Sequence, residues 1–126
     1  MSLQLVKDGL IQIKAAIVPL EDSGNVEEIK AALNNLIGWL PTSATYVAES
    51  EKFYNIKIGE LQKSWMKTDM TATEKKMLFQ GEAAEEIATM TEAERLNKAL
   101  VHAMDALRSM LSMSKEELKL NNYQQA

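Results

Sequence analysis

A chain of 126 residues has the size of one domain, so we expect a single core over residues 1–126 and no second module. A hydrophobic fraction of 46% argues against disorder, and only two prolines and five glycines argue against a fold of many short strands. The absence of cysteine excludes disulfides and thiol chemistry, and a net charge of −4 without a basic tract is atypical of non-specific DNA or membrane binding.

The N-terminal part of the chain predicts two amphipathic helices, because apolar residues recur there at spacings of three and four. The first helix is predicted over residues 3–18, where Pro19 ends it. The second is predicted over residues 26–40, after a capping box that begins at Asn25 and before Pro41.

A third helix is predicted over residues 44–67, with Thr42 or Ser43 as its N-cap. Its apolar side chains cover a wide arc of the helix surface. A helix of this kind either lies centrally in a bundle or contacts a partner as well as its own core.

The C-terminal half predicts two further helices, over residues 73–88 and 92–120, followed by a frayed tail at 121–126. A capping box that begins at Thr71 precedes the first of them. The apolar stripe changes its angular phase between them, and capping-box spacings begin at Thr89 and Thr91, so we expect a break or kink near Met90. An unbroken helix from Thr73 would instead span about 70 Å at 1.5 Å per residue, and such a rod would favour oligomerisation.

These patterns together predict an all-α protein, a bundle of four or five helices whose long last helix carries a coiled-coil-like seam. Helices this amphipathic in so short a chain favour a homo-oligomer. The residues expected to form the face for a partner or for self-association are Tyr46, Phe53, Trp65, Leu100, Met104, Leu107 and Leu111.

A polar strip on the last predicted helix holds the single histidine of the chain. His102 and Asp105 are three residues apart and share this face with Ser109. One interpretation is an acid–base pair that serves the serine, and the other is a polar face in contact with solvent or a partner. We favour the second, because nothing in the sequence indicates a catalytic pocket, and we expect no enzyme, metal or cofactor.

Three cations, Arg108, Lys115 and Lys119, cluster on one flank of the same helix. They could contact the phosphates of nucleic acid or another anion. Alternatively, they complement the C-terminal helix dipole and the neighbouring Glu116 and Glu117, which is the interpretation we favour because three phosphate contacts give only weak binding.

The segment AERLNKALVHAMDALRSMLSMSKEEL, residues 93–118, resembles the C-terminal end of small helical proteins encoded by phages and prophages. The resemblance covers about a fifth of the chain and consists of common helix-forming residues. It implies a phage-encoded accessory or host-interaction protein with no defined activity, and it assigns no site.

Three functions remain open from the sequence. The first is a non-enzymatic helical protein that binds another protein, of host or phage, or itself. The second is a nucleic-acid accessory protein in DNA recombination or replication, which uses Arg108, Lys115 and Lys119. The third is an oligomer that sequesters a small ligand or nucleotide, with His102 and Arg108 lining a pocket between subunits. No apolar stretch reaches the length of a membrane span and no signal peptide is evident, so we expect a cytoplasmic protein.

Overall fold

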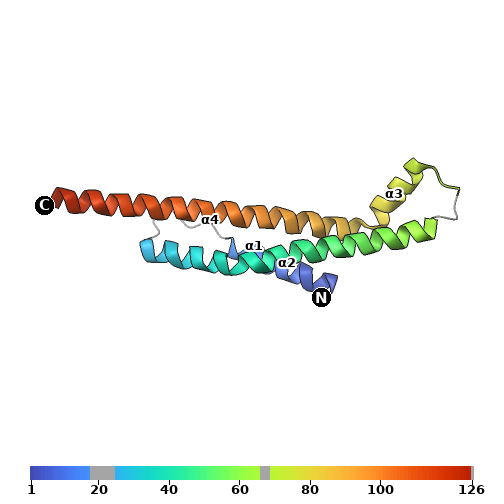
Figure 1. The fold of residues 1–126 in the computed structure, drawn as a ribbon, viewed down its shortest axis with the longest axis horizontal. Coiled ribbons are helices and arrows are strands. Elements are labelled where there is room, and N and C mark those ends of the chain that lie inside the picture. Colours follow the sequence, from blue (N-terminus) through green and yellow to red (C-terminus); the bar gives the residue numbers. More distant parts are fainter. Residues whose placement is uncertain (18–24, 66–68, 126) are drawn as a thin grey trace.

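The computed structural model describes residues 1–17, 25–65 and 69–125. Within these ranges the chain forms four helices and no strand: α1 (Leu3–Ala16), α2 (Val26–Trp65), α3 (Ala72–Glu82) and α4 (Ala84–Gln125). The predicted all-α class is therefore confirmed. The molecule is elongated, and two long helices run along its length (Figure 1).

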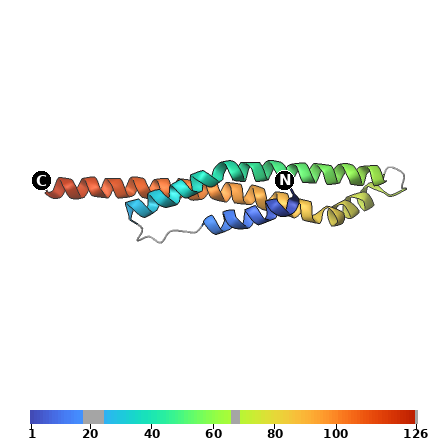
Figure 2. The ribbon, with the colours of Figure 1, turned by 90° about the horizontal axis from the view of Figure 1, so that it is seen from below.

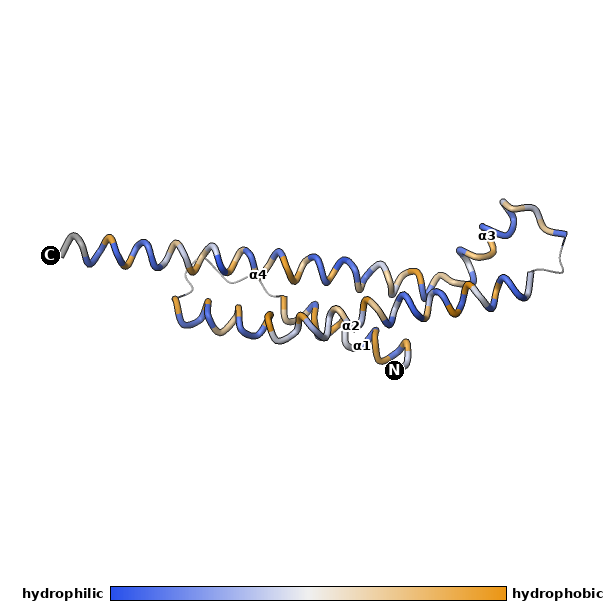
Figure 3. The backbone as a smooth tube through the Cα atoms, in the orientation of Figure 1, coloured by the Kyte–Doolittle hydropathy of each residue, from blue (hydrophilic) through white to orange (hydrophobic). Residues whose placement is uncertain are grey.

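The long helices α2 and α4 lie side by side in opposite directions and share the most extensive contact between any two elements (Figures 1 and 2). Apolar residues recur along both of them instead of forming one block, so each presents an apolar stripe to the other (Figure 3). A buried cluster joins the first part of α2 to the middle of α4; its members are Ile29, Leu33, Leu36, Leu100, Met104 and Leu107.

The short helix α1 packs against the middle of α2 and the first part of α4. Its buried residues form a second cluster with α4 (Val6, Leu10, Ile13, Ala93 and Leu96), and Tyr46, Val47 and Phe53 of α2 pack around it. Gly9 allows this approach, because a Cβ atom at this position would lie 2.3 Å from the Tyr46 ring. The Tyr46 side chain therefore occupies the space that any larger residue at position 9 would need.

Small polar residues fill the central part of the contact between α2 and α4. Ser43 and Ser50 are fully buried on α2. The Asn97 side chain of α4 donates a hydrogen bond to Ser43 Oγ at 3.1 Å, while the Ser50 hydroxyl donates to the Val47 carbonyl at 2.8 Å. These bonds satisfy groups whose burial without partners would be unfavourable.

Pro41 lies inside α2, so the expected end of a helix at residue 40 and the separate start at residue 44 are wrong. A proline in a helix removes one backbone hydrogen bond and clashes with the preceding turn. Tertiary packing outweighs that penalty here, because α2 buries Leu36 before the proline and Ser43 after it against one continuous partner. Ser43 is a core residue and not the expected N-cap.

The predicted break near Met90 is also wrong, since α4 continues through it for 42 residues, about 63 Å. The chain instead breaks at Ala83, which is the C-cap of α3 and is fully buried. Thr89, one of the expected capping residues, is a buried interior residue whose hydroxyl donates to the Glu85 carbonyl at 2.8 Å. Because the Thr89 hydroxyl is hydrogen-bonded within α4, this residue does not act as the N-cap of a new helix.

Two expected N-caps are confirmed. Asn25 Oδ1 accepts the backbone N–H of Glu28 at 2.9 Å, and Thr71 Oγ1 accepts that of Glu74 at 3.2 Å. The sequence analysis missed a third cap, Ser2, whose hydroxyl accepts the Leu5 N–H at 3.1 Å. The predicted helix ends at residues 18 and 67 lie outside the described residues, and α4 extends to Gln125, past the expected end at residue 120.

Candidate interaction surfaces

The polar strip predicted on the last helix lies on the surface of α4. His102, Asp105 and Ser109 are all exposed. The Asp105 carboxylate accepts a hydrogen bond from Arg108 at 3.2 Å, so the acid is engaged by a cation of its own helix. Among the described residues, no other element covers this strip, and its exposure agrees with a solvated polar face.

The three predicted cations are also exposed on α4. Arg108 pairs with Asp105 at 3.2 Å, and Lys119 lies 3.8 Å from Glu116. Two of the three cations therefore have acidic neighbours one turn away, which reduces the positive potential of this flank. Exposed pairs of this kind contribute little to stability.

The residues predicted to form an association face are distributed over three places. Leu100, Met104 and Leu107 are buried against α2 of the same chain, and Leu111 packs at the edge of that cluster. Tyr46 and Phe53 pack around the second cluster. Trp65 lies apart from them, at the end of α2 next to α3. Within one chain, most of this face serves the internal core.

The end of α4 extends past the start of α2 (Figure 1). We call residues 112–125 the overhang. Beyond Leu111, the last residue of α4 that packs on the first cluster, three apolar side chains are more than half exposed: Met113 at 64%, Leu118 at 53% and Leu120 at 62%. The sequence analysis included none of these three in the association face. Leu118 lies two turns after Leu111 on the same side of α4, whereas Met113 and Leu120 lie on the other side.

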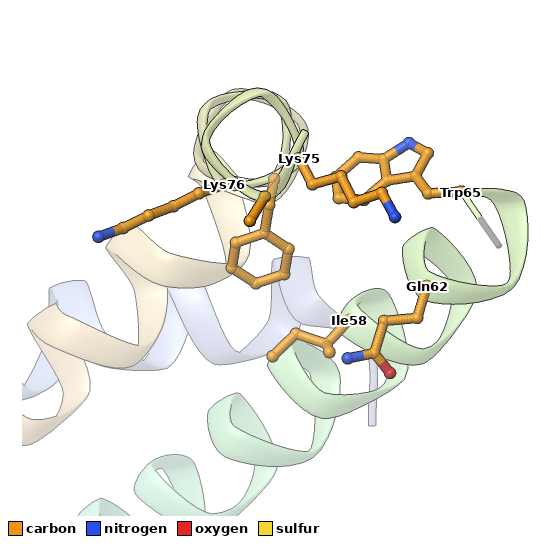
Figure 4. A pocket seen from close by; sticks show the side chains of 7 residues that line it. Ile58, Gln62, Trp65, Lys75 and Lys76 are labelled. Atoms are coloured by element: carbon orange, nitrogen blue, oxygen red, sulfur yellow. The ribbon is translucent and has the colours of Figure 1, made fainter. Parts of the chain in front are cut away.

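A groove of about 630 Å³ lies between the end of α2 and α3 (Figure 4). Its lining residues are Ile58, Gln62, Trp65, Ala72, Lys75, Lys76 and Phe79. Phe79 meets Tyr54 and Trp65 edge to face, with ring centroids 6.0 and 6.5 Å apart. Such aromatic pairs stabilise contacts beyond the area that they bury. Of the lining residues, only Trp65 had been singled out from the sequence.

A smaller hollow of about 370 Å³ separates α1 from the first turns of α4. Lys7 of α1 forms an ion pair with Glu85 of α4 across it, and Lys14 and Glu92 also line it. The Lys7 and Glu85 side chains are 34% and 58% exposed, so the pair is accessible to solvent and fixes the position of α1 only weakly.

Two carboxylate oxygens, Glu49 Oε2 and Glu86 Oε2, are buried without a hydrogen-bond partner among the described residues. Over the same part of the chain, no group of three or more metal-ligating side chains comes together. No helix in the described ranges combines the length and the apolarity that a membrane span requires.

Comparisons with known proteins identify no family for this chain. The chain matches no model of a known protein family, no curated protein and no solved structure.

Proposed function

We propose that this protein is a non-enzymatic helical interaction protein that acts as a homo-oligomer, with the overhang of α4 as its self-association element. The observation that carries the proposal is that α4 continues past α2 and that Leu118, which is in line with the buried Leu100 and Leu107, is 53% exposed. A small accessory protein of this kind agrees with the resemblance of residues 93–118 to small helical phage proteins.

Helix stability supports a packing partner for the overhang. Fourteen residues extend about 21 Å as a helix, and a helical segment of this length without tertiary packing is only marginally stable in water. The packed part of α4 provides the nucleus, but each further turn still needs a contact on its apolar side. A partner that covers Leu118 would provide that contact.

Charge and geometry favour a second copy as the partner. Lys115 and Lys119 balance Glu116 and Glu117, so the charged side chains of the overhang sum to zero although the whole chain carries −4. Two overhangs can therefore pair without net repulsion. Because α2 runs antiparallel to α4, an antiparallel overhang from a second copy would continue the line of α2 along the same coiled-coil-like seam.

Leu118→Glu is expected to weaken self-association at least about tenfold, because two buried leucines per dimer would be replaced by charges. Sedimentation equilibrium over a range of protein concentrations measures the change in the dimer dissociation constant. Met77→Glu is the matched control, since Met77 is 68% exposed on α3 and lies away from the overhang.

Circular dichroism should show that both variants keep their helices. A wild-type chain that remains monomeric at every concentration would overturn the proposal, as would equal weakening of the dimer by Leu118→Glu and Met77→Glu.

The exposure of Arg108, Lys115 and Lys119 favours a second candidate, a nucleic-acid accessory protein, because a symmetric oligomer would double this set of cations. Fluorescence anisotropy with single-stranded and duplex DNA at rising salt tests it. Electrostatic contacts are strongest at low salt, so an absence of binding at about 50 mM would remove this candidate.

A further inference from the structure

The groove between α2 and α3 lies at the opposite end of the rod from the overhang (Figure 1). It is separate from the surface proposed for self-association, and a test of one does not depend on the other. Its volume, about 630 Å³, is that of a small-molecule site, and the groove is open to solvent.

The walls of this groove are mainly apolar. Ile58 and Trp65 come from α2, and Ala72 and Phe79 come from α3. The rings of Trp65 and Phe79 meet edge to face at 78°. They therefore form a corner and not a parallel slot into which a flat base would insert. Such a corner suits the flexible or bulky apolar body of a ligand better than a stacked nucleobase.

The polar groups of the groove indicate the charge of the ligand. Figure 4 shows Lys75 extending toward Trp65, whereas Lys76 extends away from the other labelled side chains. Lys75 is partly buried, and the Gln62 amide lies on the same lining. One ammonium group that extends toward Trp65 matches a single negative charge, which an uncharged ligand would not supply.

We propose that the α2–α3 groove binds an amphiphilic carboxylate, a small molecule with an apolar body and one carboxylate group. The apolar body lies against Ile58, Phe79 and Trp65, and the carboxylate accepts hydrogen bonds from Lys75. A phosphate ester with two negative charges fits less well, because of the two lining lysines only Lys75 extends toward Trp65 (Figure 4).

Helix α3 is suited to close over such a ligand. It has no buried residue of its own, and Leu78 and Met77 are exposed. Its aromatic contacts with α2 run through Phe79. Because α3 has few packing contacts of its own, a bound ligand is expected to stabilise it. Slower exchange of the backbone amide hydrogens of residues 72–82 would show this effect.

The test uses Trp65 as the reporter. Trp39→Phe leaves Trp65 as the only tryptophan, and dodecanoate below its critical micelle concentration is the probe. We expect a saturable change in Trp65 emission with dodecanoate. Dodecyltrimethylammonium has the same apolar chain with the opposite charge, and adenosine monophosphate has a base and a phosphate; both should bind at least about tenfold more weakly.

Two substitutions in the same background locate the site. Lys75→Glu should weaken dodecanoate binding about tenfold, whereas Lys98→Glu, the same change at an exposed position of α4, should leave it unchanged. Phe79→Ala should weaken the binding of dodecanoate through the loss of apolar contact.

Several results would overturn the proposal. These are the absence of a saturable response to dodecanoate, equal affinity for the cationic amphiphile, tighter binding of the nucleotide, and equal effects of Lys75→Glu and Lys98→Glu. None of them would bear on self-association through the overhang, since sedimentation measures that property without a ligand.

Discussion

Leu100→Ala is expected to lower the free energy of unfolding by about 2–5 kcal/mol, the range for a leucine truncated inside a packed core. Leu100 is fully buried where α2 and α4 meet, in the cluster that includes Leu36 and Met104. A small domain has only about 5–15 kcal/mol of stability in total, so this one change should remove a large part of it.

Val101→Ala is the matched control for this prediction, because Val101 is the next residue on the same helix and is 40% exposed. It should change stability by less than about 1 kcal/mol, as exposed substitutions usually do. Urea denaturation followed by circular dichroism measures both variants. Similar losses in the two would contradict the assignment of the main core to the contact between α2 and α4.

Local features of the fold could be predicted from the sequence because they depend on neighbouring residues. The caps at Asn25 and Thr71 need only a side chain and an N–H group three residues away. The apolar spacing of α1 likewise identifies Val6, Leu10 and Ile13 as the buried side of that helix. In each case the deciding interaction lies within one or two turns.

Helix continuity could not be predicted in the same way, because it depends on packing between distant segments. Pro41 disfavours a helix locally, yet the partner helix α4 stabilises α2 on both sides of it. Near Met90 the capping pattern suggested a break, but burial of Thr89 and Ala93 against the other helices keeps α4 intact. The break at Ala83, two residues after Gly81, was not anticipated.

The candidate surfaces show the same division. The exposure of Arg108, Lys115 and Lys119 follows from their place on one flank of the helix, beside the apolar stripe. Apolar spacing alone does not say whether the same chain or a second copy covers a stripe, and so Leu100 and Met104 were assigned to an association face although α2 buries them. The α2–α3 groove depends on how α3 packs against the end of α2, which no local pattern specifies.

Gly9→Ala is expected to lower the free energy of unfolding by about 2 kcal/mol, although alanine is the better helix former by about 1 kcal/mol. The new Cβ atom would lie 2.3 Å from Cζ and from the hydroxyl oxygen of Tyr46. To relieve this overlap, the Tyr46 ring must turn away from Gly9, which disturbs its packing around the second core cluster. The lost packing outweighs the gain in helix propensity.

Gly38→Ala makes the same substitution on α2 where nothing lies within 4 Å of the new Cβ atom. Only the propensity term remains there, so this variant should be more stable than the wild type by about 0.5–1 kcal/mol. The two glycine variants are therefore expected to have effects of opposite sign in the same denaturation experiment.

The Tyr46→Ala background separates the overlap from other effects at Gly9. Without the ring, the alanine at position 9 has space, and Gly9→Ala should become neutral or stabilising relative to Tyr46→Ala alone. The coupling between the two sites, about 2–3 kcal/mol, then measures how strongly α1 depends on this one close approach. Gly9→Ala could instead be equally destabilising with and without the ring. In that case the overlap with Tyr46 is not the cause of the destabilisation, and the docking of α1 in this position is wrong.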